Sequence, residues 1–305
     1  MSNFIDWEKS QKTILFDSSM GLGLKSLGFD VNNPLWTAKA LVTDPDKIYQ
    51  VHREYFDAGS NIASTDSYQA NLAGFIDQGY TRDEAEKWIK GSVQLAQKAR
   101  EDSTGKQTKW VAGAIGPYGA YLADGSEYTG DYSLSDEDLR AFHQDRLDWL
   151  IAAGVDLLAI KTIPNFKEIQ VLAQMISKYP DVPVYFSLSL KDAHHLSDGT
   201  DLHIVQDFLE KQPSIVAYGA NCFHPRFADD AIKYFTENAK GDKDILIAPN
   251  AGGQYDPSVK KWGEPIDKVF SDNAPKWREE GAKWIGGCCE MKPEEMQAVH
   301  DELVQ

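Results

Sequence analysis

The sequence lacks the features of a secreted disulfide scaffold or a nucleic-acid-binding protein. It has only 3 cysteines in 305 residues, and so small and odd a number does not supply a disulfide framework. Basic residues are also scarce, because 31 Lys+Arg stand against 47 Asp+Glu, for a formal net charge of −16. Such a surface repels phosphate backbones and anionic lipids. We therefore expect no nucleic-acid partner and a reducing, cytoplasmic location.

Long hydrophobic runs and linkers are missing as well. No stretch approaches the roughly 18 consecutive apolar residues that span a bilayer. The N-terminal segment MSNFIDWEKSQK has no basic start followed by an apolar region, as a secretory signal would. We expect neither a membrane partner nor export. Because no proline-rich or serine-rich linker divides the chain, residues 1–305 are predicted to form one domain.

Short apolar runs alternate with longer amphipathic stretches along the chain. This alternation is typical of βα units that build a parallel sheet. Eight such runs occur, at residues 13–17, 60–65, 110–115, 155–161, 182–190, 215–221, 245–249 and 283–286. Eight units favour a single closed (β/α)8 barrel of the TIM type over an open sheet, because a closed barrel has no edge strand to protect.

The ends of several helices can be predicted from local patterns. Asp44 before a proline and Ser135 before an acidic turn are typical N-cap residues. Gly59, Gly154 and Gly281 each stand between a helical pattern and a strand, which predicts a left-handed turn at each helix end. Segments 117–133 and 250–262 are predicted to be long loops at the C-terminal face of the barrel, where the active site is expected.

All three cysteines directly follow predicted strands. Cys222 comes after the sixth strand, and Cys288 and Cys289 come after the eighth. These strands flank the seventh in a barrel, so the three thiols can meet at its C-terminal mouth. Adjacent residues of a regular strand point to opposite faces. We therefore expect the backbone to turn there, with Gly286 and Gly287 supplying the conformational freedom.

Three thiolates form a soft donor set that suits Zn²⁺ and leaves the fourth tetrahedral position open, as in catalytic zinc sites. A substrate thiol in that position would be a thiolate near neutral pH, although a free thiol has a pKa of about 8.5. The chemistry indicated is attack by a substrate sulfur on an electrophilic carbon. The alternatives are three buried structural cysteines, or a Cys288–Cys289 disulfide in a metal-free redox-sensing protein.

Several motifs resemble the homocysteine S-methyltransferase family, in its bacterial S-methylmethionine-dependent branch. Gly286-Gly287-Cys288-Cys289 together with Asn221-Cys222 resembles the zinc site of that family. The run GPYGAYLADGSEY at 116–128 is a highly specific match. Further matches lie at 35–39, 67–70, 196–200 and 249–253, so the resemblance covers nearly the whole chain.

The resemblance implies a (β/α)8 barrel in which Cys222, Cys288 and Cys289 bind Zn²⁺. The sulfur of homocysteine would take the fourth position and receive a methyl group from S-methylmethionine or S-adenosylmethionine, giving methionine. Homocysteine and a sulfonium methyl donor are thus the expected partners. The residues expected to contact the substrate are Asp17, Ser18, Ser19, Ser67, Lys161 and Asn221.

Two positions depart from the family pattern. The first strand ends in Asp17-Ser18-Ser19 where the family has Asp followed by Gly, and Lys161 stands where the family has a glutamate that helps to hold the substrate ammonium. A lysine there would oppose that ammonium at a cost of about 1 kcal/mol or more. We therefore expect weaker homocysteine binding than in relatives. Lys161 is expected to pair with Asp17 or Asp66, to bind a substrate carboxylate, or to extend to the barrel rim.

Lys161 also leaves a different class of enzyme open. A lysine at the end of a barrel strand, with its pKa lowered by burial, forms Schiff bases with carbonyl substrates in aldolases. This alternative leaves the three cysteines without a role. The methyltransferase is therefore the favoured hypothesis.

Overall fold

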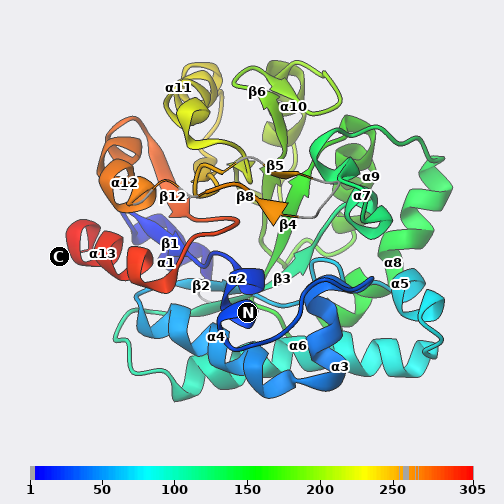
Figure 1. Ribbon diagram of the computed structural model, residues 1–305. Coiled ribbons are helices and arrows are strands. Elements are labelled where there is room, and N and C mark those ends of the chain that lie inside the picture. The colour runs from blue at the N-terminus through cyan, green and yellow to red at the C-terminus, as the bar shows by residue number, and fades with distance from the viewer. Residues whose placement is uncertain (1–3, 254, 257–260, 265, 267, 305) are drawn as a thin grey trace.

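The computed structural model describes residues 4–253, 255–256, 261–264, 266 and 268–304. Parallel strands close into a barrel in the order β1-β12-β9-β8-β5-β4-β3-β2, with helices around it (Figure 1). The barrel strands are β1 (Ile14–Phe16), β2 (Ile62–Ser64), β3 (Trp110–Ile115), β4 (Leu157–Ile163), β5 (Val184–Leu188), β8 (Ile215–Asn221), β9 (Asp244–Ala248) and β12 (Ala282–Gly286). Each overlaps one predicted run, so the predicted (β/α)8 barrel is confirmed.

One main helix follows each barrel strand. These helices are α4 (Pro45–Asp57), α6 (Arg82–Asp102), α8 (Asp136–Ala152), α9 (Phe166–Ile176), α10 (Leu202–Glu210), α11 (Ala228–Asn238), α12 (Val269–Glu279) and α13 (Pro293–Leu303). Shorter helices are α1 (Phe4–Ser10), α2 (Met20–Ser26), α3 (Lys39–Thr43), α5 (Leu72–Asp77), α7 (Tyr118–Leu122) and the 3₁₀ turns η1 (Trp36–Ala38), η2 (Ser126–Tyr128) and η3 (Pro225–Phe227). In the described part of the chain, no helix has both the length and the apolar character needed to cross a membrane.

The predicted helix ends are confirmed. Asp44 and Ser135 are the N-cap residues of α4 and α8, although only the Ser135 side chain accepts a backbone N–H of its helix. Gly59, Gly154 and Gly281 have φ angles of +105°, +82° and +112°. These are left-handed values that side chains disfavour. Each glycine therefore lets the chain leave a helix and enter the next barrel strand within a few residues.

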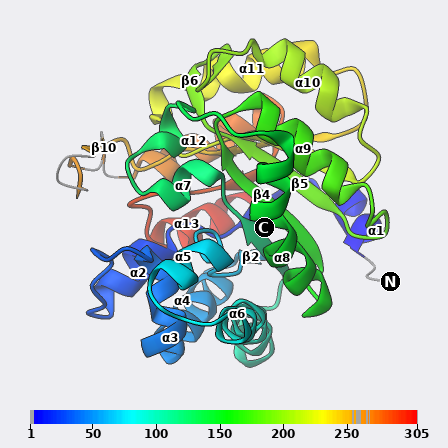
Figure 2. The same ribbon diagram turned by 90° about the vertical axis from the view of Figure 1, so that its right-hand side faces the viewer.

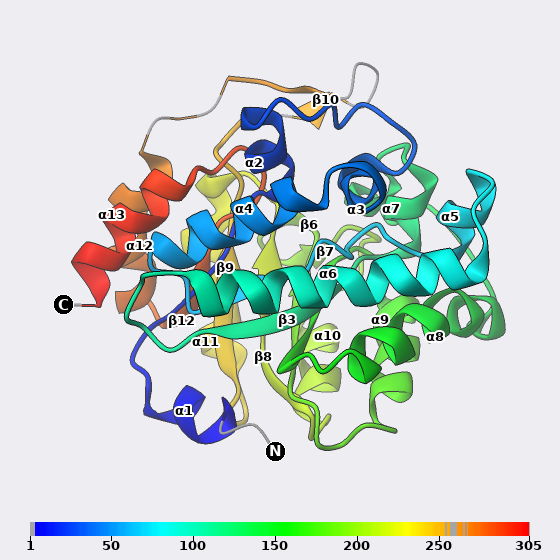
Figure 3. The ribbon, with the colours of Figure 1, turned by 90° about the horizontal axis from the view of Figure 1, so that it is seen from below.

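The barrel interior is filled at its N-terminal end by large aromatic side chains. Tyr185 and Trp284 point inward with their ring centroids 5.5 Å apart, and Phe16 lies 5.9 Å from Tyr185. Phe4 of α1 packs beneath them, 6.0 Å from Trp284. In Figures 2 and 3, α1 and β10 (Tyr255–Asp256) lie at opposite ends of the molecule. The filled N-terminal end leaves the C-terminal mouth as the place for a site.

The two segments predicted to be long loops contain short elements. Segment 117–133 holds α7 and η2, and segment 250–262 holds β10 paired antiparallel with β11 (Lys261–Trp262). Residues 254 and 257–260 of the second segment lie outside the described residues. Another hairpin, β6 (Leu190–Asp192) with β7 (His195–Leu196), follows β5. Elements of two to five residues are too short to show a hydrophobic period, so the loop prediction was wrong in detail.

We expect Gly219→Ala to destabilise the fold by about 3 kcal/mol or more. Gly219 of β8 pairs with Leu246 of β9, and a Cβ at this glycine would lie 1.9 Å from the Leu246 carbonyl oxygen. That oxygen belongs to a barrel strand and cannot move aside without distorting the sheet. The change is measured by urea unfolding followed by circular dichroism.

Gly91→Ala is the matched control for this substitution. Gly91 lies inside α6, and an added Cβ there has no neighbour within 4 Å. Alanine should therefore stabilise the helix by roughly 0.5–1 kcal/mol. Equal effects of the two substitutions would contradict the strand-contact explanation.

Candidate metal centre and substrate cavity

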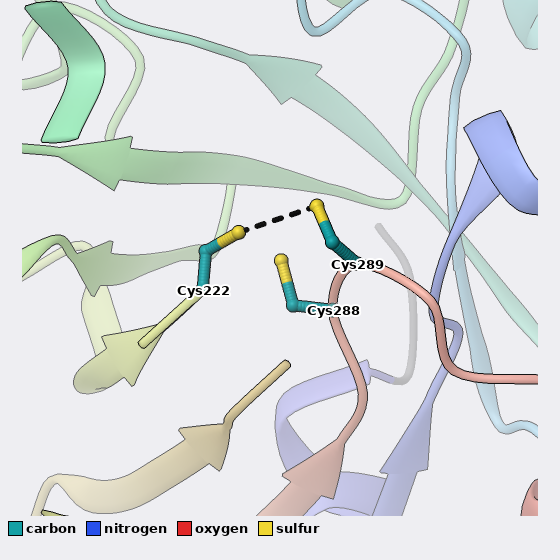
Figure 4. A group of neighbouring side chains, drawn as sticks. All are labelled: Cys222, Cys288 and Cys289. Carbon is teal, nitrogen blue, oxygen red and sulfur yellow. Dashed lines mark hydrogen bonds between the residues drawn. The ribbon is translucent and has the colours of Figure 1, made fainter. Parts of the chain in front are cut away.

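The three cysteines meet at the C-terminal mouth of the barrel. Their sulfur atoms all lie within 4.8 Å of one another, and Figure 4 shows the three side chains pointing toward a common centre. Sγ of Cys222 lies 3.4 Å from Sγ of Cys289. The strands that precede them, β8 and β12, lie on either side of β9. The predicted convergence of Cys222, Cys288 and Cys289 is confirmed.

Backbone hydrogen bonds to the end of β9 hold both cysteine segments in place. The Cys222 N–H donates to the carbonyl of Ala248 at 2.9 Å, and the Cys288 N–H donates to the carbonyl of Pro249 at 3.0 Å. Cys222 has a φ angle of +59°, which residues other than glycine rarely adopt. The chain therefore turns sharply directly after β8, at a metal-ligand candidate.

Gly286 and Gly287 do not supply the backbone freedom that the sequence suggested. Neither has a positive φ, and the left-handed residue of this segment is Glu290, at +62°. The glycines are needed for space instead. A Cβ at 286 would lie 2.5 Å from the ring of Phe16, and a Cβ at 287 would lie 2.4 Å from the hydroxyl of Ser18. The expectation that these glycines supply backbone flexibility was therefore wrong. Close packing against neighbouring side chains requires them instead.

The donor chemistry and spacing of the cluster fit a tetrahedral metal ion. Metal–sulfur distances of about 2.3 Å place two thiolate ligands roughly 3.8 Å apart, which lies between the 3.4 Å contact and the 4.8 Å limit of this cluster. Hydrogen bonds from Cys222 and Cys289 lower the pKa of the Cys288 thiol, and contacts within the cluster raise the pKa values of Cys222 and Cys289. A bound metal ion would replace the thiol protons of the cluster.

Lys161 and Asp17 are joined through Ser64 at the floor of the mouth. Lys161 Nζ donates to Ser64 Oγ at 3.3 Å. The hydroxyl and the backbone N–H of Ser64 donate to the Asp17 carboxylate at 2.9 and 2.7 Å. The expected pairing with Asp17 is therefore present, bridged by a hydroxyl, whereas the side chain of Asp66 is hydrogen-bonded to Thr37.

Lys161 keeps its positive charge in this position. Burial by itself lowers the pKa of its ammonium, but Tyr185, Asp17 and the cysteine thiols outweigh burial and raise the pKa above its usual range. Burial likewise raises the pKa of Asp17, and Lys161 opposes that shift. A Schiff-base lysine needs a neutral amine near neutral pH. The charged environment of Lys161 therefore disfavours the aldolase alternative.

Three of the remaining predicted substrate residues lie at the mouth, and one does not. Ser18, Ser19 and Asn221 line the same cavity as the three cysteines. Ser67 is fully buried, and its hydroxyl donates to the carbonyl of Ala114 at 2.7 Å. The structure therefore brings Ser18, Ser19 and Asn221 together with Asp17 and Lys161, and leaves Ser67 behind the cavity wall.

The polar side chains at the mouth also fix the segments that carry the cysteines. Ser18 Oγ donates to the carbonyl of Cys288 at 2.9 Å, and Ser19 accepts a backbone N–H as the N-cap of α2. The Asn221 amide donates to Thr162 Oγ1 at 2.8 Å and lies 3.6 Å from Sγ of Cys288. Such contacts orient metal ligands and influence metal affinity.

Aromatic rings and carboxyl groups complete the cavity wall. Trp36, Tyr68 and Tyr128 line it, together with Asp66 and Glu127. The Tyr128 hydroxyl lies 3.6 Å from Sγ of Cys222. No periodicity or spacing in the sequence marks these residues individually. The available signal is their position in segments that follow β1, β2 and β3, at the face where the site of a barrel is expected.

A buried network supports this wall from behind. Glu168 of α9 is fully buried and accepts the backbone N–H of Tyr118 at 2.8 Å, and its other oxygen accepts the hydroxyl of Tyr132. His143 of α8 lies 2.7 Å from the same carboxylate through Nε2. Glu168 therefore ties the segment after β3, which carries Glu127 and Tyr128, to two outer helices.

Arg146 extends the network to the segment after β2. Its guanidinium donates to the carbonyls of Tyr68 and Gly116, both at 2.7 Å, and to Nδ1 of His143 at 3.0 Å. Because a guanidinium only donates, Nδ1 accepts and the His143 proton lies on Nε2, facing Glu168. Burial lowers the pKa values of His143 and Arg146, the latter to about 10. The histidine is thus neutral and the arginine charged at neutral pH.

The fold and the site together define a (β/α)8 barrel enzyme with a cluster of three cysteines, able to hold a metal ion, at its C-terminal mouth. The chain belongs to the homocysteine S-methyltransferase family, whose model matches residues 14–303. A homocysteine S-methyltransferase of Escherichia coli (strain K12) is 41% identical over 296 residues, covering 95% of this chain and 94% of that protein. The homocysteine S-methyltransferase YbgG of Bacillus subtilis (strain 168) is 39% identical, with 94% and 93% covered.

Solved structures agree with this assignment. The homocysteine methyltransferase MmuM of Escherichia coli in its oxidized form superposes with a TM-score of 0.90 at 38% identity, covering 99% of this chain and 100% of that one. Its metallated form gives a TM-score of 0.89 with the same identity and coverage. The family and fold predicted from sequence motifs are therefore confirmed.

We expect Glu168→Ala to destabilise the protein by about 3–5 kcal/mol, because it leaves the buried charge of Arg146 without its anion. Chemical denaturation measures the loss. Glu137→Ala is the control, since Glu137 is an exposed residue in the first turn of α8 and its removal should cost under about 1 kcal/mol. If the two variants are equally stable, the network does not hold the wall.

Proposed function

We propose that this chain transfers a methyl group from S-methylmethionine to the thiol of homocysteine, giving methionine, with Zn²⁺ bound by Cys222, Cys288 and Cys289. S-adenosylmethionine is the second candidate donor. The observation that carries the proposal is the convergence of three thiols beside a cavity in a member of this family. Zinc is the favoured ion because it prefers thiolate ligands and tetrahedral sites with one open position.

The reaction needs an acceptor thiolate and a cationic methyl donor. Bound zinc would supply the first by holding the acceptor thiol as a thiolate near neutral pH. The acceptor sulfur attacks the methyl carbon, so that a new S–C bond forms while the donor S–C bond breaks. The bonding electron pair stays on the donor sulfur, which becomes a neutral thioether, and the thiol proton goes to water. With S-methylmethionine, both products are methionine.

The floor of the cavity suits the acceptor, which is a zwitterion. We assign the homocysteine ammonium to Asp17 and its carboxylate to Lys161, because these two residues present opposite charges on either side of Ser64. Ser18 and Ser19 border the same floor. Asn221 orients Cys288 through its contact with the sulfur. Ser67 does not contact the substrate and instead supports the cavity wall through its hydrogen bond to the Ala114 carbonyl.

Two broader features of the proposal follow from the site. Residues 1–305 act as one domain, since the site draws on β1, β4, β8 and the segment after β12. The three thiols must stay reduced to bind a metal ion, which favours a reducing compartment such as the cytoplasm.

Cys222→Ser tests the metal and the function together. We expect wild-type protein, purified under reducing conditions, to contain about one zinc per chain and to form methionine from homocysteine and S-methylmethionine. The variant should lose both, because two cysteines are too few to hold the ion. Metal content is measured by plasma mass spectrometry and methionine by chromatography, with circular dichroism as the control for folding.

The same measurements also distinguish the methyltransferase from the redox-sensing alternative. A wild-type protein without zinc, in which mass spectrometry finds a Cys288–Cys289 disulfide, would support the redox-sensing hypothesis and contradict the methyltransferase. If methionine forms faster from S-adenosylmethionine than from S-methylmethionine, only the proposed identity of the methyl donor changes.

Lys161→Glu tests the acceptor assignment. Replacing the cation by an anion removes a charge-assisted hydrogen bond to the carboxylate, so the KM for homocysteine should rise about tenfold or more. Lys87→Glu, the same charge reversal at an exposed site of α6, should leave that KM unchanged. A lower KM in Lys161→Glu would show instead that the lysine repels the substrate ammonium, as the resemblance to the family implies.

A further inference from the structure

The charged side chains that line the substrate cavity do not balance. They are Asp17, Lys25, Asp66, Glu127, Lys161 and Glu290. Lys25 pairs with Glu290 at 3.3 Å, and Lys161 is bridged to Asp17. Asp66 and Glu127 have no ion pair with any described residue, so two carboxyl groups are left over. The cavity therefore has two carboxyl groups more than its own cations can pair with.

Each of these two carboxyl groups has a buried oxygen with no hydrogen bond. Asp66 is 3% exposed, and within the described residues its Oδ2 has no partner. Oε2 of Glu127 is also buried, and it has no hydrogen-bond partner among the described residues. Buried carboxylate oxygens are normally satisfied by hydrogen bonds. Two such carboxyl groups in one cavity wall present negative charge that a cation in the cavity would compensate.

The surroundings of the two carboxyl groups favour a cation. The aromatic side chains of Trp36, Tyr68 and Tyr128 line the same cavity, and aromatic faces attract positive charge. Burial raises the pKa values of Asp66 and Glu127 to about 7. A cationic ligand in the cavity would favour the ionised form of both carboxyl groups.

We infer that Asp66 and Glu127 form the subsite that recognises the positively charged sulfonium donor. This inference rests on the proposed function and extends it by assigning the second substrate. Homocysteine has no net charge, and the charges of Asp17 and Lys161 cancel at the acceptor floor. S-methylmethionine carries one positive charge beyond its zwitterion, which matches the acidic part of the cavity.

The position of Glu127 relative to the cysteines is suitable for a donor. Glu127 and Tyr128 both belong to η2, and the Tyr128 hydroxyl lies 3.6 Å from Sγ of Cys222. A donor held at η2 therefore lies next to the sulfur cluster, where the acceptor thiol is expected. Asp66 follows β2 and borders the cavity on a neighbouring segment.

Donor recognition at these carboxylates acts on binding more than on the chemical step. Methyl transfer from a sulfonium to a thiolate neutralises both charges. A fixed carboxylate therefore stabilises the bound donor at least as strongly as the transition state. Removing it should raise the donor KM and leave kcat nearly unchanged.

Glu127→Gln and Asp66→Asn test this subsite in the zinc-loaded protein. Each variant keeps the size of the side chain and removes its charge. We expect each to raise the KM for S-methylmethionine about tenfold or more, with the homocysteine KM, kcat and zinc content within about twofold of wild type.

Asp124→Asn is the matched control for charge in the same segment. Asp124 is exposed and does not line the cavity, and its Oδ1 accepts the Ser126 N–H at 2.9 Å, which an asparagine can also do. We expect an unchanged donor KM in this variant. A donor KM that stays at the wild-type value in both cavity variants would overturn the subsite.

A binding measurement separates this subsite from the proposed function. Calorimetry compares S-methylmethionine with 2-amino-5-methylhexanoate, in which a neutral carbon replaces the sulfonium sulfur. Wild-type protein should bind the cation about tenfold more tightly or better, and both cavity variants should lose that preference. If the protein binds the cation preferentially but forms no methionine, the methyltransferase proposal is rejected and the cation subsite is kept. If it forms methionine but shows no preference for the cation, only the subsite is rejected.

Thermal stability distinguishes a binding role from a structural one. Both variants remove a buried charge that no described cation compensates, so the melting temperature should rise, by about 2 °C or more. A fall in melting temperature, accompanied by equal increases in the KM values of both substrates, would show that the two carboxylates support the fold and would overturn the inference.

Discussion

Three thiols can share one centre only if distant segments of the chain end at the same point. Cys222 and Cys289 are 67 residues apart in sequence, yet their sulfur atoms are 3.4 Å apart. Closure of the barrel achieves this by placing β9 between β8 and β12, and carbonyls at the end of β9 accept the backbone N–H groups of Cys222 and Cys288. The left-handed backbone of Cys222 is tolerated because these hydrogen bonds over-determine it. The cavity and its charges are arranged around this point.

The charges around the cysteine cluster fall into two sets that match the two reactants. Asp17 and Lys161 balance each other through Ser64, which suits a zwitterionic acceptor. Asp66 and Glu127 are unbalanced, which suits a cationic donor. Transfer of the methyl group then removes charge from both reacting sulfurs. The products therefore need less solvation than the reactants.

Groups outside the cavity keep these charges in position. Glu168, His143 and Arg146 form a hydrogen-bonded chain that ends on the backbone of the segments after β2 and β3. A buried hydrogen-bonded network of this kind gives a loop the rigidity that loops otherwise lack. The wall that carries Tyr68 and Glu127 is therefore part of the packed protein, and its carboxylates stay oriented before any substrate binds.

The amino-acid sequence by itself determined the eight βα units, the left-handed glycines at 59, 154 and 281, and the convergence of the cysteines, because hydrophobic period, glycine φ and strand order are local or topological properties. Only the tertiary structure decided the rest. It showed that Gly286 and Gly287 make space for Phe16 and Ser18, that Ser67 faces away from the cavity, and that Asp66 and Glu127 share its wall. These properties depend on which distant side chains become neighbours, and no local pattern encodes that.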